Sequence, residues 1–185
     1  MFTSNRDSDF TNNVENWELY VGYVDNTNNP VRRLTTNDAR DIDPVWSPNG
    51  SKIVFESNRD GNWELYSINP DGSGETRLTE DGADDINAFW TRDSQSVIFQ
   101  TNRDGLWQLY RLNVSTLEVI QISDGSMAEH DAAVSFDNTK LAFRAIVDGK
   151  SVIFASKLDG SDRVQVSDSA ASSLNHTWSP DNLSL

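Results

Sequence analysis

Apolar and polar residues alternate along short stretches of this chain, and turn-forming residues separate the stretches. In Trp63-Glu64-Leu65-Tyr66-Ser67-Ile68 the polar residues Glu64 and Ser67 alternate with apolar ones, as in a half-buried strand. A β-branched and aromatic run, Ile53-Val54-Phe55, precedes it. Between the two lies the turn Asn58-Arg59-Asp60-Gly61, in which Asp-Gly is a strong hairpin signal. The apolar spacing of a helix is missing, so the pattern predicts antiparallel strands.

The strand pattern returns every 44 residues. Tryptophan occupies one repeated position at Trp46, Trp90 and Trp178, and Val134 replaces it once. A three-residue unit recurs at the same interval, as Arg33-Leu34-Thr35, Arg77-Leu78-Thr79, Gln121-Ile122-Ser123 and Gln165-Val166-Ser167. A fixed period of this length indicates one supersecondary unit copied several times. Each copy cannot bury its apolar face alone, so the copies must pack on one another.

Each copy contains four predicted strands. In residues 41–84 they are Pro44-Val45-Trp46, Ile53-Val54-Phe55, Trp63 to Ile68, and Thr76 to Thr79. Four-stranded antiparallel units of about 40–50 residues are typical of propeller blades. We therefore predict an all-β protein, a β-propeller of four-stranded antiparallel blades, in a single domain over residues 1–185. The copies span 1–40, 41–84, 85–128 and 129–172, and residues 173–185 begin a fifth that supplies a closing strand.

The two ends of the chain match complementary parts of the repeat. Met1 to Asp7 matches Val54 to Asp60, so the first copy starts inside a second strand, and it carries an insertion at 8–16. Trp178 to Leu185 matches Trp46 to Ile53. The strand at 177–180 could then seal a closed four-bladed ring. Alternatively, the chain is half of a larger ring that a homodimer completes, or a fragment of a longer product.

The repeat resembles PD40, the WD40-like blade of the TolB family. The likeness is carried by Trp46-Ser47-Pro48-Asn49-Gly50, Lys52-Ile53-Val54-Phe55, Ser57-Asn58-Arg59-Asp60-Gly61, Glu64-Leu65-Tyr66 and Arg77-Leu78-Thr79. It implies a propeller whose first strands line a central channel and which binds protein partners. It also implies a periplasmic location, although Met1 to Asp7 lacks the apolar core of a signal peptide, so we leave the compartment open.

Composition narrows the classes of partner. The net charge is −14, from 15 basic and 29 acidic residues, which disfavours nucleic acid and anionic lipid and favours solubility or a basic partner. No apolar stretch is long enough to span a membrane. Cysteine is absent, which excludes disulfides, cysteine–zinc sites and cysteine nucleophiles.

The sequence offers little catalytic chemistry. It has no Gly-x-Ser-x-Gly elbow, no His-Glu-x-x-His and no phosphate-binding P-loop. Its two histidines, His130 and His176, occupy positions that are apolar or Pro in other copies, and we expect them to pack or to cap turns. We therefore do not expect an enzyme.

Acidic and amide residues gather at the predicted start of each first strand. The equivalent positions are Asp43, Asn87, Asp131 and Asn175, with Asp41, Asp85, Glu129 and Ser173 two residues earlier. If first strands line the channel, as the resemblance implies, these oxygen atoms would meet at its mouth and could bind Ca²⁺. We favour the other interpretation, in which Asp and Asn form turns before the strands, and name no certain cofactor.

We interpret the repeated arginines and most of the repeated tryptophans as structural residues before we consider functional roles for them. Arg59 and Arg103 recur beside Asp60 and Asp104, and we expect ion-pairing or packing arginines and turn-forming aspartates. Trp46, Trp90 and Trp178 should pack between blades, whereas Trp17, Trp63 and Trp107 could form a partner surface. The predicted function is a non-catalytic scaffold that binds a protein or peptide. The alternative is a carbohydrate-active or peptidase-associated propeller with a cation at the channel mouth.

Overall fold

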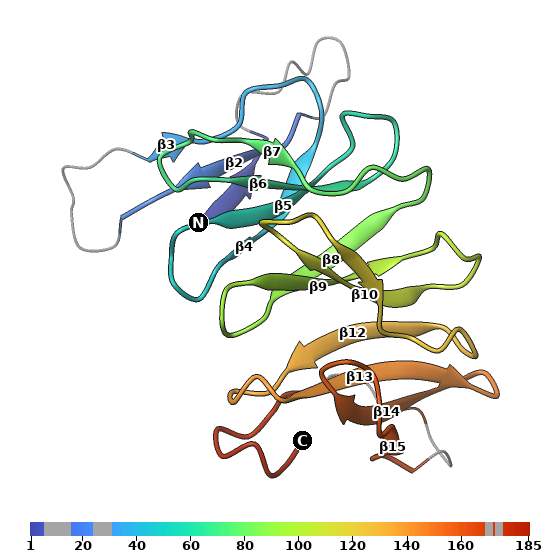
Figure 1. The fold of residues 1–185 in the computed structure, drawn as a ribbon. Helices are drawn as coiled ribbons and strands as arrows, with labels where there is room; N and C mark the ends of the chain where they lie inside the picture. Colours follow the sequence, from blue (N-terminus) through green and yellow to red (C-terminus); the bar gives the residue numbers. More distant parts are fainter. Residues whose placement is uncertain (6–15, 24–30, 169–171, 173–175) are drawn as a thin grey trace. The chain divides into compact units, whose positions relative to one another are not determined.

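The computed structural model of the chain describes residues 1–5, 16–23, 31–168, 172 and 176–185, and among them all regular structure is strand (Figure 1). From the N-terminus the strands are β1 (Phe2–Ser4), β2 (Glu18–Val21), β3 (Arg32–Arg33), β4 (Asp41–Trp46), β5 (Ile53–Ser57), β6 (Glu64–Ile68), β7 (Thr76–Arg77), β8 (Asp85–Trp90), β9 (Ser96–Thr101), β10 (Gln108–Asn113), β11 (Val119–Gln121), β12 (Glu129–Val134), β13 (Lys140–Val147), β14 (Lys150–Lys157) and β15 (Val164–Gln165). No helix of the described residues is long and apolar enough to cross a bilayer.

The described strands form four sheets in which consecutive strands are neighbours. The first sheet is β1-β2-β3, and the others are β4 to β7, β8 to β11 and β12 to β15. Pairing is antiparallel within the first, second and fourth sheets and between β9, β10 and β11, as in β5 with β6, where Phe55 faces Tyr66. The predicted all-β propeller blades are confirmed. The first sheet has three strands because the first copy begins inside a second strand, as its match to Val54 to Asp60 predicted.

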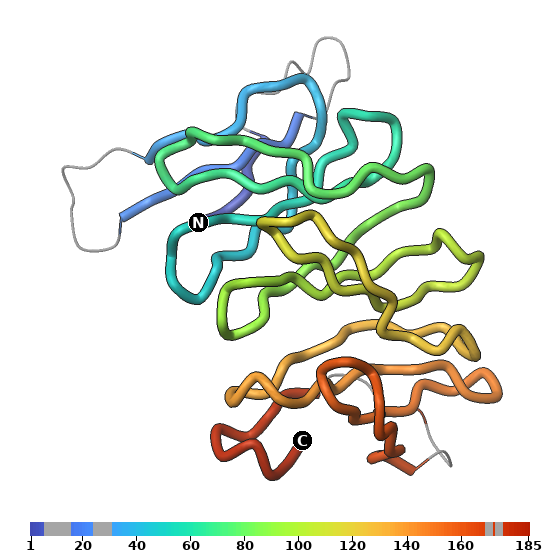
Figure 2. The backbone as a smooth tube through the Cα atoms, in the orientation of Figure 1, coloured from blue at the N-terminus to red at the C-terminus, as the bar shows by residue number. Residues whose placement is uncertain are grey.

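The chain divides into two compact units, residues 1–88 and 89–185, with β8 crossing the boundary (Figure 2). The first unit therefore holds the first two sheets, and the second holds β9 to β15. We describe each unit by itself. The prediction of one domain over 1–185, and both predicted ways of closing a ring, stay predictions.

A sheet-to-sheet core fills each unit. In the first unit, Leu19, Val21 and Leu34 pack with four side chains of β5 and β6: Ile53, Phe55, Tyr66 and Ile68. In the second unit, Ile98, Leu109 and Ile122 pack with Val134, Leu141, Phe143 and Ala145. Each fully buried apolar side chain contributes about 1.5–3 kcal/mol. The repeated apolar positions thus hold neighbouring sheets together. This agrees with the prediction that the copies pack on one another.

The recurring three-residue unit ends each sheet with a hydroxyl. The backbone N–H of Leu19 donates to Thr35 Oγ1 at 3.0 Å, and that of Leu65 donates to Thr79 Oγ1 at 2.9 Å. Serine does the same in the later copies, where Leu109 N donates to Ser123 Oγ at 2.6 Å. A buried N–H without a partner is costly, so the third residue of the unit must carry a hydroxyl.

A second hydroxyl organises the turn between first and second strands. Ser47 Oγ donates to Asn49 Oδ1 at 2.8 Å and accepts from Lys52 N at 2.9 Å. Near the C-terminus, Ser179 Oγ accepts from Ser184 N at 3.0 Å. Residues 176–185 contain no strand among the described residues, yet they form this turn. The segment therefore has the local structure that precedes a second strand.

Strand register divides the extra length of the first copy. Ser4 pairs with Glu18, fourteen positions later, whereas the equivalent Ser57 pairs with Glu64, seven positions later. The connection between β1 and β2 is therefore longer than the connection between β5 and β6 by the difference between these two separations. Tyr20 pairs with Arg33 and Tyr66 with Arg77, which places two further residues in the loop before β3. Most of the predicted insertion, 8–16, lies outside the described residues.

Tryptophan packing follows the prediction at two positions of three. Trp90 and Trp178 are buried, but Trp46 is 40% exposed, so its predicted burial is wrong. The Trp178 indole N–H donates to the backbone carbonyl of Ala133 on β12, at 2.9 Å. β12 is the first strand of its sheet. The sheet that precedes Trp46 is β1-β2-β3, whose described strands do not include a first strand like β12. The carbonyl that would accept from the Trp46 indole is therefore missing from that sheet.

Candidate functional site

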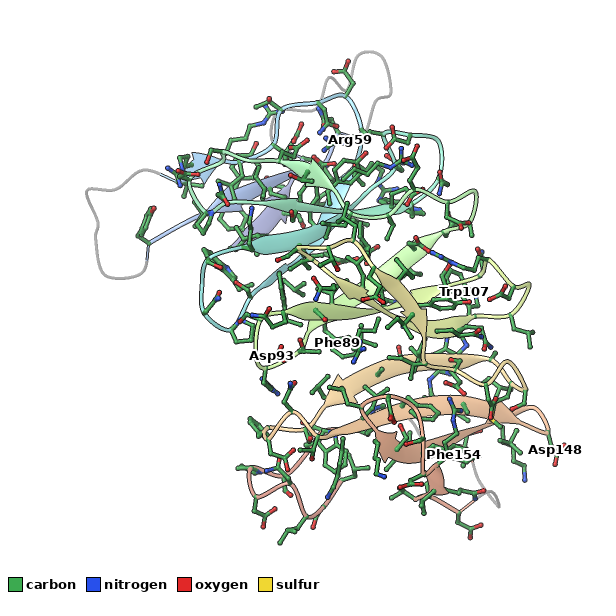
Figure 3. All side chains as sticks on the ribbon, in the orientation of Figure 1. Arg59, Phe89, Asp93, Trp107, Asp148 and Phe154 are labelled. Atoms are coloured by element: carbon green, nitrogen blue, oxygen red, sulfur yellow. The ribbon has the colours of Figure 1, made fainter. Side chains whose placement is uncertain are left out.

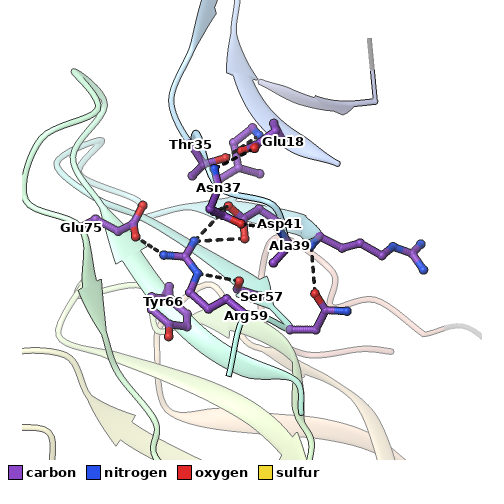
Figure 4. Close-up of polar contacts among 12 residues, drawn as sticks. Glu18, Thr35, Asn37, Ala39, Asp41, Ser57, Arg59, Tyr66 and Glu75 are labelled. Carbon is purple, nitrogen blue, oxygen red and sulfur yellow. Dashed lines mark hydrogen bonds and ion pairs between the residues drawn. The ribbon is translucent and has the colours of Figure 1, made fainter. Parts of the chain in front are cut away.

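The first acidic position of each first strand is fully buried. Asp41, Asp85 and Glu129 are each 0% exposed. Asp41 accepts two hydrogen bonds from Arg59 Nη2, at 3.0 and 3.1 Å, and one from Asn37 Nδ2 at 2.7 Å (Figure 4). Arg59 also pairs with Glu75 and lies 4.3 Å from the ring centroid of Tyr66. The predicted ion-pairing and packing role of Arg59 is confirmed, and Asp41 is used in that ion pair.

Glu129 obtains its cation from a different strand. The equivalent of Arg59 in this copy is Val147, and Arg163, just before β15, pairs with Glu129 instead. The Arg163 guanidinium lies 5.1 Å from the Phe143 ring, as that of Arg59 lies 5.8 Å from the equivalent Phe55. A buried carboxylate without a cation is strongly destabilising. This copy therefore lacks the arginine of the hairpin turn, and an arginine from another sequence position places its guanidinium beside the equivalent carboxylate.

The turn that lost its arginine is also the tightest. Asp148 lies at the tip of the β13–β14 hairpin (Figure 3), with φ of 48°, and Gly149 follows with φ of 74°. Two residues with positive φ form the turn that best matches the twist of a hairpin. Val147 pairs directly with Lys150, so pairing extends to the turn itself.

The second acidic position of each first strand is a bulge. Asp43, Asn87 and Asp131 have φ of 48°, 53° and 53°. The pairing register shifts between Ile42 and Val45, and between His130 and Ala133. Asp and Asn tolerate this left-handed conformation better than other side chains except glycine. The backbone thus explains the repeated residue type, although the bulge lies within the strand and not in a turn before it.

One buried carboxyl escaped the sequence reasoning. Glu56 on β5 accepts a hydrogen bond from the backbone N–H of Asn87 at 2.6 Å. Burial raises the pKa of Glu56 to about 7; the Asn87 hydrogen bond opposes the shift, and the charge of Asp43 adds to it. The available signal was a polar residue inside each second strand, since the equivalents of Glu56 are Gln100 and Arg144.

The second unit places both histidines near Asp131 and Arg144. His130 Nδ1 lies 3.2 Å from Gln100 Oε1, and Arg144 Nε donates to Asp131 Oδ2 at 2.6 Å. Burial, then the positive charge of Arg144, lowers the pKa of His130. Burial is also the main cause that lowers the pKa of His176. Both imidazoles are therefore neutral near pH 7, and both are half-buried, as packing histidines would be.

The predicted Ca²⁺ site stays a prediction. Asp41, Asp43, Asp85 and Asn87 belong to the first unit, and Glu129 and Asp131 to the second. Among the residues that the structure describes, no three His, Asp or Glu side chains are grouped closely enough to hold a metal ion. The fourth equivalents, Ser173 and Asn175, lie outside that part of the chain.

The three tryptophans of the predicted partner surface are half-buried. Their backbone carbonyls are fixed, because Asp41 N donates to Trp17 O, Asp85 N to Trp63 O and Glu129 N to Trp107 O, at 2.7–2.8 Å. Trp63 also has the Arg40 guanidinium 6.0 Å from its ring centroid. The backbone of each tryptophan thus links the start of a third strand to the first strand of the next sheet. The role of the three tryptophans as a partner surface stays a prediction.

A hollow opens in the first unit between residues 37–39 and the turn that contains Asn58. Its volume is 360 Å³, and it is lined by Asn37, Asp38, Ala39, Asn58 and Arg59. Arg40 follows the first three in sequence, and its N–H donates to Asn58 Oδ1 at 2.9 Å. The hollow therefore combines amide and charged groups, and the backbone of Arg40, whose guanidinium lies over Trp63, is bonded to one of its lining residues. Such a surface can bind polar backbone and a large side chain at once.

Repeated four-stranded sheets, packed face to face through apolar side chains, define a β-propeller protein. The family model of the TolB beta propeller domain, PD40, matches residues 44–185, and the chain belongs to this family. It is similar to a putative TolB from Agrobacterium tumefaciens, with 21% identity and a TM-score of 0.68, over 83% of this chain and 57% of that one. It is also similar to TolB from Acinetobacter baumannii, with 17% identity and a TM-score of 0.73, over 90% and 41% of the two chains.

Enzymes share the fold. An oligogalacturonate lyase from Vibrio parahaemolyticus is 18% identical, with a TM-score of 0.61, over 80% of this chain and 46% of the lyase. At such identity the likeness concerns the fold alone. The chain spans about half the length of these solved structures.

Proposed function

We propose that this chain is a non-catalytic scaffold that binds a protein or an extended peptide. The observation that carries the proposal is the polar hollow lined by Asn37, Asn58 and Arg59, together with Arg40, which bonds Asn58 through its backbone N–H and lies over Trp63. Tryptophan and arginine dominate binding energy at protein interfaces. Asn37 and Asn58 bond within the chain to Asp41, Ala39 and Arg40. A side-chain amide has two donor hydrogens and an oxygen with two lone pairs, however, so each can also bond the backbone of a bound chain.

Charge favours a basic partner. The net charge of −14 would speed association with a positively charged peptide and weaken association with an acidic one. Asp38 is exposed at the hollow and would meet such a peptide directly. The carboxylates of Asp41 and Glu129 are instead occupied by Arg59 and Arg163, which supports a structural role for them.

The test is selection of a displayed library of short random peptides on the immobilised protein. We expect selected peptides to carry net positive charge and to lose at least about tenfold in affinity on Trp63→Ala, a loss of roughly 1.4 kcal/mol or more. The matched control is Phe136→Ala, which removes an exposed aromatic ring that also has an arginine over it, Arg92 at 4.7 Å. Peptides that bind both variants equally, or no selected peptide at all, would contradict the proposal.

The enzyme-associated alternative makes a different prediction. A cation at the first-strand positions would raise the melting temperature on adding Ca²⁺ or Mn²⁺. An unchanged melting temperature, with retained peptide binding, would favour the scaffold.

A further inference from the structure

Arg144 on β13 has donor hydrogens that the fold leaves unused. Its Nε donates to Asp131 Oδ2 at 2.6 Å, and its Nη1 donates to Ser151 Oγ at 3.3 Å. A guanidinium carries five N–H donors, and the described part of the chain gives Nη2 of Arg144 no hydrogen-bond partner. Arg59 is equally little exposed, yet its guanidinium nitrogens all donate to other side chains, those of Ser57, Glu75 and Asp41.

His130 and Gln100 lie beside this guanidinium. His130 is the direct partner of Arg144 in the register of β12 with β13, and Gln100 Oε1 on β9 lies 3.2 Å from His130 Nδ1. Gln100 is only 3% exposed, and its Nε2 has no partner within the described ranges. The two polar atoms of one amide are neighbours, so these unused N–H groups also lie near His130. A buried donor without an acceptor is costly, which points to an acceptor from outside the chain.

The charges around His130 come from its own strand and from the next one. Asp131 follows it on β12, Arg144 faces it from β13, and β9 contributes the uncharged Gln100. The remaining titratable neighbour is His176; burial lowers its pKa, and the charges of Asp131 and Arg144 also act on it. With both imidazoles neutral near pH 7, one carboxylate balances one guanidinium. The cluster is therefore locally uncharged in a chain of net charge −14, and its unused groups are mostly donors.

We propose that Arg144 and His130 bind a carboxylate group. Arginine holds carboxylates through parallel N–H bonds, and Nη2 of Arg144 is available for such a bond. The Gln100 amide can add a further hydrogen bond. Because Gln100 Oε1 only accepts, His130 Nδ1 carries the ring hydrogen, and Nε2 is the atom that takes up a proton. An anion nearby favours the charged imidazole and raises the pKa of His130, so binding takes up a proton.

This site is separate from peptide binding at Trp63. It lies on β9, β12 and β13 of the second unit, whereas the polar hollow and the Arg40–Trp63 pair lie in the first. Either proposal can therefore fail without the other. The net charge of −14 opposes the approach of an anion, so we expect a weak site, with a dissociation constant on the order of 1 mM.

The test is a titration of N-acetylglycine into the protein at constant ionic strength, followed by NMR. This ligand carries the carboxylate of a chain terminus, and its uncharged amide, N-acetylglycinamide, is the control. The chain has two histidines, so the imidazole signals are readily assigned. We expect saturable shifts of the His130 signals, and binding at least about fivefold tighter at about pH 5.5 than at about pH 8, because the charged imidazole binds better. The amide should cause neither effect.

Sodium acetate separates two sources of the same group. An affinity for acetate that equals or exceeds that for N-acetylglycine would identify the ligand as a small free acid. Tighter binding of N-acetylglycine would identify it as the C-terminus of a peptide chain. Either outcome supports a carboxylate site.

The repeat supplies variants that should fold. Arg144→Gln introduces the residue that β9 carries at this position, Gln100, and should weaken binding at least about tenfold through loss of the guanidinium. His130→Ile introduces the residue of two earlier copies, Ile42 and Ile86, and should remove the pH dependence while Arg144 still binds. Backbone amide spectra follow binding in both variants and establish that they fold.

Lys157→Gln is the matched control. It removes one positive charge from an exposed side chain of the same unit and should leave carboxylate binding unchanged. Equal weakening by Lys157→Gln and Arg144→Gln would mean that only net charge matters. That result, the same shifts with N-acetylglycinamide, or no saturable shift with N-acetylglycine would overturn the proposal.

Discussion

Arg59 and Arg163 place a guanidinium beside the same buried carboxylate position from two different strands. Arg59 follows the second strand of its sheet, and Arg163 precedes the fourth strand of its own. Both lie over an equivalent phenylalanine, Phe55 or Phe143. What the repeat conserves is thus the charge pair in space and not the residue that supplies it.

Removing Arg163 should lower the free energy of unfolding substantially. Arg163→Met removes the ion pair that the described residues give to Glu129, which is fully buried, and leaves the Ser123 hydroxyl as its hydrogen-bond donor. We therefore expect a loss of about 3–5 kcal/mol in the free energy of unfolding by urea. Adding Glu129→Gln should recover at least half of that loss, because it removes the unpaired charge. The control is Lys157→Met, whose ion pair with Asp162 is exposed and whose loss should leave the free energy of unfolding nearly unchanged.

Glu56 should make stability depend on pH. Its pKa in the folded chain is raised from 4.5 to about 7, so the folded state holds the proton more tightly than the unfolded state. Its contribution is present below pH 4.5 and is lost as pH rises through about 7. Glu56→Gln should therefore gain stability over the unmodified chain as pH rises across this window, by about 3 kcal/mol in total. A stability difference that does not change with pH would contradict this.

The sequence predicted the ion-pairing role of Arg59 but not that of Arg163. Arg59 recurs as Arg103 in the same turn motif, so an ion-pairing role could be inferred. Position 163 is Glu75, Val119 or Val31 in the other copies and gives no repeated signal. The pKa of Glu56 depends on burial by chain segments far away in sequence, which alternation along β5 alone does not report.

At the scale of elements, hydroxyl groups and bulges fix how each sheet ends and bends. Thr79 Oγ1 accepts from Leu65 N and donates to Glu64 Oε2 at 2.5 Å. Asp43 and Asp131 turn their first strands through a left-handed residue. Strand identities and turn positions followed from alternation and Asp-Gly pairs, whereas the bulges did not, since Asp in a turn and Asp in a bulge look the same in sequence.

Replacing Thr79 with valine should cost about 1–3 kcal/mol in the free energy of unfolding. The side chain keeps its shape, but the buried N–H of Leu65 loses its acceptor. Thr79→Ser keeps the hydroxyl, as Ser123 does in another copy, and should cost less. Chemical unfolding of the two variants side by side would decide, and equal losses would mean that the methyl group matters and the hydroxyl does not.

Glycine and valine at position 43 should behave in opposite ways. Asp43→Gly should keep the stability of the chain, because glycine adopts φ of 48° freely. Asp43→Val should cost about 1–2 kcal/mol, since a β-branched residue is strained there. Thermal unfolding with and without Ca²⁺ measures both effects. A Ca²⁺-dependent rise in melting temperature that disappears in Asp43→Gly would favour the cation site over the bulge.

At the scale of the whole molecule, charge repulsion opposes compactness. The chain carries 29 acidic residues against 15 basic ones, while the ion pairs Arg77–Glu64 and Arg163–Glu129 involve buried carboxylates. Salt screens exposed charges much more than buried ones. The repeat length and blade architecture were predictable at this scale, but the division into two units was not, since the 44-residue period crosses it without interruption.

Sodium chloride should therefore raise the melting temperature. Screening weakens repulsion between exposed carboxylates and leaves pairs such as Arg77–Glu64 largely intact. The measurement is a thermal unfolding series from low to moderate ionic strength, with sucrose as an uncharged control for solvent effects. A melting temperature that falls with salt would show that exposed ion pairs stabilise the chain more than repulsion destabilises it.

The exchange of Arg59 for Arg163 also bears on how such a gene can change by recombination between its own repeats. A crossover between the hairpin turn and the fourth strand would join the Arg59 turn to the Arg163 strand, giving two guanidinium groups for one carboxylate. The reciprocal product joins Val147 to Glu75 and leaves a buried acid with no base and an added acid nearby. In an exchange between these two copies, a crossover that keeps turn and fourth strand together preserves one guanidinium for each buried carboxylate, so selection for folding favours inheriting the two segments as one unit.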